Sequence, residues 1–216
     1  MKKLPFRQDG LKALVFDLDG TLYNNARMGE LVNLGACNYI AHLNGVSVEQ
    51  ADAMLREARY SMVESGGTLS RAVISLGGNL KDLHERLSQD VTPEGILSVE
   101  PRVPQLLKAL ATRFAVHIYT NNNRSLSARI MKEIGVSGLF GKVFTIEDYW
   151  RPKPDQAALQ GILEAIGCRP EETLFVGDRF EVDLALPAKL GCRIYEACTT
   201  DQLAELFQLV EEKGSP

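Results

Sequence analysis

The amino-acid sequence predicts a doubly wound α/β fold, in which helices cover both faces of a parallel β-sheet. Short apolar runs alternate with helical patterns from about residue 96 onward, which is typical of this fold class. The runs are apolar throughout, which indicates strands that are buried on both faces. Residues 24–95 contain no run of this kind. The sequence therefore predicts a parallel sheet with an all-helical insertion after its first strand.

Apolar runs of about 5–6 residues are the candidate strands, because strands of globular proteins commonly have this length. They are rich in Val, Ile, Leu and Phe and are bounded by turn-forming residues. The candidates are LKALVF (11–16), AVHIY (115–119), KVFTI (142–146), TLFVG (173–177) and, with the weakest pattern, CRIYEA (192–197).

Helical patterns lie between the later strands. Residues 124–135 repeat an apolar residue at every fourth position and end with glycine, which favours a helix with a glycine C-cap. Residues 154–167 begin with proline, which suits a first helical turn, and also end with glycine. Residues 182–191 contain Pro187, a residue that normally kinks or begins a helix.

The stretch after the first strand reads as a series of amphipathic helices. Ser47 and Gln50 form a capping-box pattern at the start of one of them. An insertion at the carboxyl end of a strand lies over the ligand crevice of an α/β sheet. We therefore expect a small helical cap domain over residues 24–95 and a Rossmann-like catalytic core formed by residues 1–23 and 96–216. The expected cap helices are 28–45, 47–65, 68–77 and 80–90.

Composition narrows the class of protein. The chain has 216 residues and a net charge of −4, which argues against a basic surface for a nucleic-acid polymer. No stretch approaches about 18 consecutive apolar residues, so we expect no membrane span. The N-terminal residues MKKLPFRQDG do not resemble a signal peptide. We expect a cytoplasmic monomer or homodimer, a location that also suits the scattered cysteines Cys37, Cys168, Cys192 and Cys198.

Polar residues follow the apolar runs at the points where the strands should end. Asp17 and Asp19 follow the first run, and Thr120 follows AVHIY. Asp178 follows TLFVG, with Asp183 five residues later. Because the carboxyl ends of parallel strands lie at one edge of the sheet, we expect these side chains to converge there. Lys153, which precedes the proline at the start of a predicted helix, is expected to reach the same edge.

Such a group of acidic side chains needs a compensating positive charge. Two carboxylates ~4 Å apart repel by roughly 4 kcal/mol at an effective dielectric constant of 20. A pocket of carboxylate oxygens suits a hard cation, and Mg²⁺ commonly binds one or two carboxylates together with phosphate and water. Thr120 and Asn121 offer a hydroxyl and a backbone N–H to a phosphate oxygen, and Lys153 offers a positive charge. The residues together predict a site for phosphoryl chemistry.

Four motifs occur in a recognisable order: DLDGT (17–21), YTN (119–121), a lysine followed by proline (153–154), and GDRFEVD (177–183). In this order they resemble the haloacid dehalogenase superfamily, whose phosphohydrolases use an aspartate nucleophile. The resemblance covers about residues 11–198. It implies a Rossmann-like core with a helical cap of the type called C1, and an Mg²⁺-dependent enzyme that forms an aspartyl-phosphate.

The resemblance also implies a role for each motif residue. Asp17 is the expected nucleophile and Asp19 the expected general acid and base. Thr120 and Lys153 are expected to hold the transferring phosphoryl group, together with the backbone amides of Leu18 and Asn121. The expected Mg²⁺ ligands are Asp17, Asp178 and the backbone carbonyl of Asp19, with Asp183 supporting the ion's surroundings.

The substrate is a small phosphate ester by the same resemblance, because dehalogenases and phosphonate-cleaving members lack an aspartate at the position of Asp19. The segments 65–72 and 120–131 are loosely similar to the pyrimidine 5′-nucleotidase-like branch, which suggests a 5′-nucleotidase. The alternatives are a phosphoglycolate or sugar-phosphate phosphatase, a phosphomutase of the same fold and a non-enzymatic receiver domain. The candidate residues for substrate selection are Tyr23, Asn24, Tyr60, Thr68, Arg71 and Arg124.

The histidines and the single tryptophan are expected to have structural roles. His42, His84 and His117 have no metal-ligand spacing, and we expect them at the surface or at the edge of the core. Trp150 is expected to pack near the loop that carries Lys153.

Overall fold

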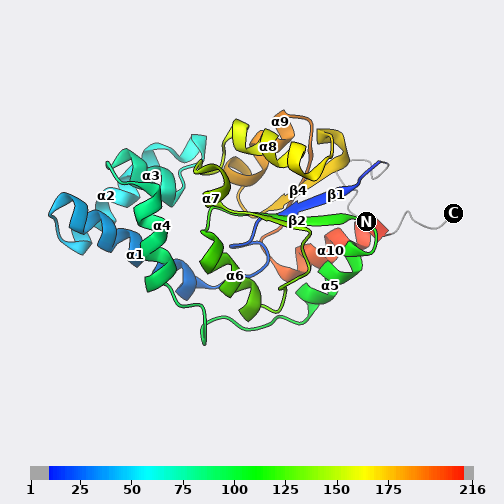
Figure 1. Ribbon diagram of the computed structural model, residues 1–216, viewed down its shortest axis with the longest axis horizontal. Coiled ribbons are helices and arrows are strands. Elements are labelled where there is room, and N and C mark those ends of the chain that lie inside the picture. The colour runs from blue at the N-terminus through cyan, green and yellow to red at the C-terminus, as the bar shows by residue number, and fades with distance from the viewer. Residues whose placement is uncertain (1–9, 212–216) are drawn as a thin grey trace.

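A computed structural model describes residues 10–211 of the chain. Within them, a five-stranded parallel sheet has the order β3-β2-β1-β4-β5 (Figure 1). β1 lies at the centre, with Leu14 paired to Val116 on one side and to Leu174 on the other. The predicted fold class is confirmed. The strands are β1 (Ala13–Phe16), β2 (Ala115–Tyr119), β3 (Lys142–Phe144), β4 (Thr173–Gly177) and β5 (Arg193–Glu196).

Helices cover both faces of the sheet, as the apolar runs predict. α8 and α9 lie on one face, and α5, α6 and α10 lie on the other (Figure 1). Successive strand residues point to opposite faces. Leu14 and Phe16 accordingly pack in the core beneath α5, α6 and α10, whereas Val15 packs in the core beneath α8. These helices are α5 (Arg102–Ala111), α6 (Arg124–Glu133), α8 (Gln156–Ile166), α9 (Ala185–Lys189) and α10 (Thr200–Glu211), and a short α7 (Ile146–Tyr149) follows β3.

Some predicted boundaries are wrong for local reasons. Strand 142–146 ends early, because Thr145 and Asp148 form a capping box that begins α7. Pro154 precedes α8 and is not in its first turn, since Asp155 is the N-cap. Predicted helix 182–191 begins as a π-helical turn, Phe180–Leu184, and Pro187 then lies in the first turn of α9. Proline is tolerated there because a first-turn N–H has no helical partner.

Four helices between β1 and α5 form a separate layer beyond the carboxyl edge of the sheet (Figure 1). They are α1 (Ala26–Asn44), α2 (Val48–Ser61), α3 (Leu69–Ser75) and α4 (Leu80–Asp90), and we call residues 26–90 the helical segment. The predicted Ser47–Gln50 capping box is present. α2 ends before the predicted residue 65, and a 3₁₀ turn, Val63–Ser65, follows it. A second 3₁₀ turn, Pro170–Glu172, precedes β4.

The helical segment is joined to the sheet layers by specific contacts. Asn25 donates to the carbonyl of Ile96 at 3.3 Å, and Asn123 donates to the carbonyl of His84 at 3.1 Å. One apolar cluster also runs continuously from the helical segment into the face beneath α5 and α10. The division into a cap of residues 24–95 and a core of residues 1–23 and 96–216 stays a prediction.

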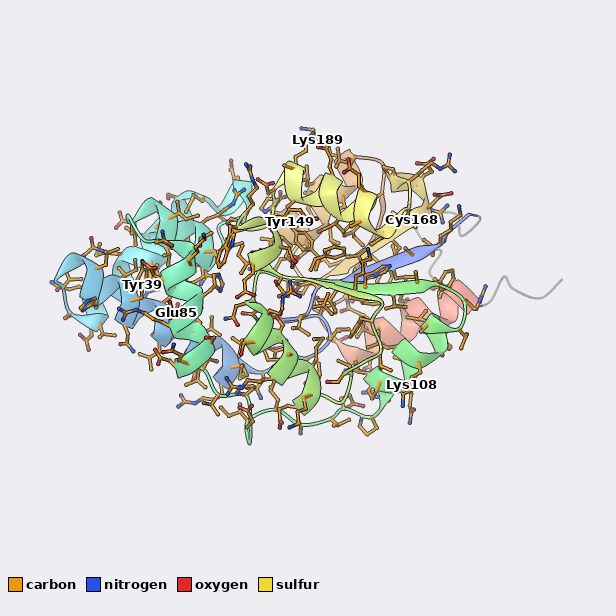
Figure 2. All side chains as sticks on the ribbon, in the orientation of Figure 1. Tyr39, Glu85, Lys108, Tyr149, Cys168 and Lys189 are labelled. Atoms are coloured by element: carbon orange, nitrogen blue, oxygen red, sulfur yellow. The ribbon has the colours of Figure 1, made fainter. Side chains whose placement is uncertain are left out.

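None of the helices within residues 10–211 is both long and apolar enough to cross a lipid bilayer. The signal-peptide prediction depends on residues 1–10, of which residues 1–9 lie outside the described part of the chain. All four cysteines are free thiols. Cys168 lies at the end of the sheet away from the helical segment (Figure 2).

Candidate active site

The carboxyl end of β1 delivers two aspartates into a tight turn. Asp17 extends the sheet, because its N–H donates to the carbonyl of Val176 at 2.8 Å. The chain then turns at Gly20, which has a φ of 85°. A Cβ on Gly20 would lie 2.7 Å from Cγ of Asp178, closer than side chains normally approach. The glycine of the DLDGT motif therefore lets the ends of β1 and β4 approach each other.

Lys153 is the positive centre of the site and is almost fully buried, with 2% of its surface exposed. Its Nζ lies 2.5 Å from Oδ1 of Asp17 and 2.6 Å from Oδ1 of Asp183. It also donates to the carbonyl of Tyr119 at 3.0 Å. Although burial lowers the pKa of Lys153, the two carboxylates raise it above its ordinary value. The lysine is therefore held as a cation between two acidic side chains.

Asp17, Asp178 and Asp183 form an acidic cluster, in which one carboxylate oxygen from each residue lies within 4.8 Å of the other two. Burial raises the pKa of Asp17 to about 7 in spite of the opposing attraction of Lys153, and burial also raises the pKa of Asp178. Oδ2 of Asp17 and Oδ1 of Asp178 are buried without a hydrogen-bond partner. Lys153 and Arg179, whose Nε lies 3.9 Å from Asp178, bring two positive charges against three carboxylates. The oxygens without a hydrogen-bond partner show where further positive charge is needed.

Asp19 is not one of the three residues of the acidic cluster and is held by three donors. The Tyr23 hydroxyl donates to its Oδ1 at 2.5 Å, and Asn122 Nδ2 donates to its Oδ2 at 2.8 Å. The Thr120 hydroxyl, which is fully buried, donates to Oδ2 at 3.3 Å and accepts from the N–H of Asn122 at 3.1 Å. Asp19 is thus oriented separately from Asp17, as a distinct role would require.

The structure brings the predicted motif residues to one edge of the sheet. Leu18 is fully buried and its side chain is apolar, so the group that it can offer to a ligand is its backbone N–H. Oδ1 of Asn121 accepts from the backbone N–H of Lys153 at 2.8 Å, which leaves its buried Nδ2 without a partner. The side chains that gather are those of Asp17, Asp19, Thr120, Asn121, Lys153, Asp178 and Asp183.

A cavity of about 420 Å³ lies between this edge and the helical segment. Among the predicted selecting residues, Tyr23, Asn24 and Thr68 line it. The other three do not lie in its lining and have different environments. Tyr60 is 81% exposed, Arg71 donates to the carbonyl of Pro154 at 2.6 Å, and Arg124 pairs with Asp148 at 2.7 Å.

Several cavity residues were not anticipated from the sequence, namely Arg59, Asn122 and Arg179. The run of three asparagines after Thr120 was the available signal for Asn122, since such a run has no helical or strand propensity to explain it. His84 was expected at the surface or core edge, but it is 3% exposed and lines the cavity. His42 is exposed and His117 is buried on β2. Trp150, on the loop before Lys153, packs near the ring of His84, with 6.4 Å between ring centroids.

Comparison with known proteins is consistent with this geometry. Residues 11–191 match the sequence profile of the haloacid dehalogenase-like hydrolases. The chain belongs to this family. It is 29% identical over 187 residues to a phosphoglycolate phosphatase of Photorhabdus laumondii, a match that covers 85% of this chain and 78% of that protein. It is 24% identical over 184 residues to a glyceraldehyde 3-phosphate phosphatase of Methanothermobacter thermautotrophicus, covering 81% and 80%.

The fold of this family member is also similar to solved structures. A phosphatase of the same superfamily from Thermococcus onnurineus superposes with a TM-score of 0.61 at 19% identity, covering 91% of this chain and 97% of that one. The sequence resemblance to the haloacid dehalogenase superfamily is therefore confirmed, and the chain is a hydrolase of that family.

Proposed function

We propose that this hydrolase cleaves small phosphate monoesters in an Mg²⁺-dependent reaction with Asp17 as the nucleophile. The observation that carries the proposal is the acidic cluster with its two unpartnered carboxylate oxygens, next to a buried lysine and a separately held Asp19. The curated relatives named above are phosphatases, which supports phosphate monoesters as the substrates.

The residues of the acidic cluster fit an Mg²⁺ ion. Carboxylate oxygens are the ligands that Mg²⁺ prefers, and Oδ2 of Asp17 and Oδ1 of Asp178 are buried without a hydrogen-bond partner. Both oxygens of Asp183 already accept hydrogen bonds, from Lys153 and from the backbone N–H of Arg179 at 3.2 Å. We therefore assign Asp17 and Asp178, with the backbone carbonyl of Asp19, as ligands, and Asp183 as the residue that holds Lys153. The ion would supply positive charge that offsets the carboxylates and the phosphate.

The side chains can divide the reaction into two displacements. In the first, a carboxylate oxygen of Asp17 attacks phosphorus, the ester P–O bond breaks, and protonated Asp19 gives its proton to the leaving alkoxide. In the second, ionised Asp19 takes a proton from water, whose oxygen attacks phosphorus and releases phosphate from Asp17. Lys153, the Thr120 hydroxyl and the amides of Leu18 and Asn121 stabilise the charge on the phosphoryl oxygens.

Similarity favours a small phosphate ester, of the phosphoglycolate or sugar-phosphate kind, over a nucleotide. The names of the relatives specify two- and three-carbon substrates. In the second of the two segments that suggested a 5′-nucleotidase, Arg124 pairs with Asp148 and Asn123 caps α6, and neither residue lines the cavity. Family membership also weighs against the receiver-domain alternative. A phosphomutase of the same fold remains the second candidate, and strict dependence on a bisphosphate activator would identify it.

Replacement of Asp17 by asparagine tests the proposal. We expect Asp17→Asn to fold, by circular dichroism, and to lose turnover of p-nitrophenyl phosphate, because the amide is a poor nucleophile. Asp90→Asn, an exposed position at the end of α4, is the matched control and should keep wild-type turnover. Chelation of Mg²⁺ should abolish wild-type activity, and added Mg²⁺ should restore it. Turnover by Asp17→Asn would remove the nucleophile assignment.

A further inference from the structure

A guanidinium group faces the cavity from the helical segment. Arg59 lies in the last turn of α2, is half-buried and lines the cavity. In the described chain, it is the only Lys, Arg, Asp or Glu that the helical segment contributes to the lining. Its Nε makes one long hydrogen bond, to the carbonyl of Gly67 at 3.4 Å. Because a guanidinium has five N–H donors, most of its binding capacity is unused.

The chain around Arg59 fixes its position relative to the site. Gly67 passes so close to the backbone carbonyl of Arg59 that a Cβ would collide with it. A Cβ on Gly66 would lie 2.7 Å from Cδ of Pro154, and Arg71 donates to the carbonyl of Pro154 at 2.6 Å. The segment that follows α2 is therefore docked against the loop that carries the buried lysine. Arg59 is held over the site by these contacts.

The charges around the cavity leave Arg59 uncompensated. Burial lowers the pKa of Arg59, and repulsion from Arg179, which also lines the cavity, lowers it further. Arg179 differs, because its Nε lies 3.9 Å from Oδ1 of Asp178 and so has an acidic partner. The neighbouring lining includes apolar side chains, which strengthen an electrostatic contact by excluding water. These apolar residues are Met28, Val32, Leu69, Leu83 and Leu87.

We propose that Arg59 binds a second anionic group on the leaving part of the substrate, and that the protein therefore selects phosphate monoesters that carry a carboxylate or a second phosphate. This inference rests on the proposed function, because the group to be hydrolysed must lie at the acidic cluster. The planar guanidinium matches both anions with two parallel N–H donors. Arg59 is a specificity-determining residue and does not touch the reacting phosphorus.

Two pairs of substrates isolate the second anion. 3-Phosphoglycerate carries a carboxylate where glycerol 3-phosphate carries a hydroxymethyl group. Fructose 1,6-bisphosphate carries one phosphate more than fructose 6-phosphate. We expect wild-type kcat/KM to favour the more anionic member of at least one pair. The pair that shows the preference identifies the anion as carboxylate or phosphate.

Arg59→Met removes the charge and keeps the length of the side chain. We expect it to lower the kcat/KM ratio within the preferred pair by roughly 10- to 100-fold. Arg59→Lys keeps the charge without the two parallel donors, and we expect an intermediate ratio. Arg56→Met is the matched control, because Arg56 lies on the same helix with a side chain 72% exposed and paired to Asp52; its ratio should equal that of the wild type.

The outcomes separate this inference from the proposed function. If the wild-type protein hydrolyses p-nitrophenyl phosphate but has equal kcat/KM values within both pairs, the role proposed for Arg59 is overturned and the proposed function is not. An unchanged ratio in folded Arg59→Met and Arg59→Lys would do the same. Failure of the wild-type protein to hydrolyse any of these esters with Mg²⁺ would overturn the proposed function.

Discussion

Replacement of Lys153 by methionine removes the one lysine in the acidic cluster. Its Nζ lies 2.5 Å from Asp17 and 2.6 Å from Asp183. At an effective dielectric constant of 20, each pair corresponds to roughly 6–7 kcal/mol of Coulomb attraction, most of which desolvation offsets. Removing one partner of a buried ion pair costs about 3–5 kcal/mol. We expect Lys153→Met to lower the free energy of unfolding by about this amount at pH 8 without Mg²⁺.

The loss should be smaller at pH 5, and the pKa of Asp17 gives the sign. Burial raises this pKa to about 7, so the carboxyl is protonated at pH 5 and ionised at pH 8 in the wild-type protein. At pH 5 the lysine therefore lacks an ionised Asp17 as a partner. Its removal therefore costs less there than at pH 8, where Asp17 must either lose its partner or take up a proton.

Urea unfolding followed by circular dichroism at both pH values measures the effect. Lys108→Met is the matched control, since Lys108 is exposed on α5 and lies far from the helical segment (Figure 2); it should change the free energy of unfolding by less than about 0.5 kcal/mol. A loss below about 1 kcal/mol for Lys153→Met at pH 8, or an equal loss at pH 5 and pH 8, would refute the reasoning.

Three further predictions test the other parts of the site. Asp19→Asn should lower kcat by at least about 100-fold and let the aspartyl-phosphate accumulate, which intact-protein mass spectrometry after acid quenching detects; wild-type turnover would contradict the acid–base role. Mg²⁺ should raise the unfolding temperature more at pH 8 than at pH 5. Because the pKa of Asp17 is raised from its ordinary value of 3.8 to about 7, the metal-free fold loses stability as the pH rises through this range. Mg²⁺ should offset that loss. Equal shifts of the unfolding temperature at pH 5 and pH 8 would exclude a direct competition between Mg²⁺ and protons. Gly20→Ala should weaken Mg²⁺ binding in calorimetry, because its Cβ would displace the carboxylate of Asp178. Gly95→Ala has a similar φ of 75° and open space around it, so equal Mg²⁺ affinities of the two variants would show that backbone strain alone is responsible.

The fold was predictable because its signals are local. Strands buried on both faces need continuous apolar runs, and the five candidate runs each contain an observed strand. Helix ends were less predictable, since they depend on which side chain reaches a free backbone N–H. Asp155, and not Pro154, sets the start of α8 by accepting from the N–H of Ala158 at 2.9 Å. The π-helical turn before α9 has no sequence signal that we recognise.

The site was predictable in its residue types and less so in its contacts. Asp17 and Asp178 follow strands that pair with each other, and strand order alone brings them together. Three adjacent asparagines carry identical side chains and make different contacts: with the Lys153 amide, with Asp19 and with the N-terminus of α6. Arg59 resembles the other arginines of the helical segment in sequence, and only packing separates it from the exposed Arg56.

By itself, the sequence determined the fold class, the family and the chemical groups that meet at the edge of the sheet, because periodicity and motif order are properties of neighbouring residues. Only the tertiary structure decided which oxygens lack partners, how deeply Lys153 is buried and which arginine faces the cavity. Burial and pairing depend on segments that are distant in the chain, and the energy of a charge depends on how much water those segments exclude.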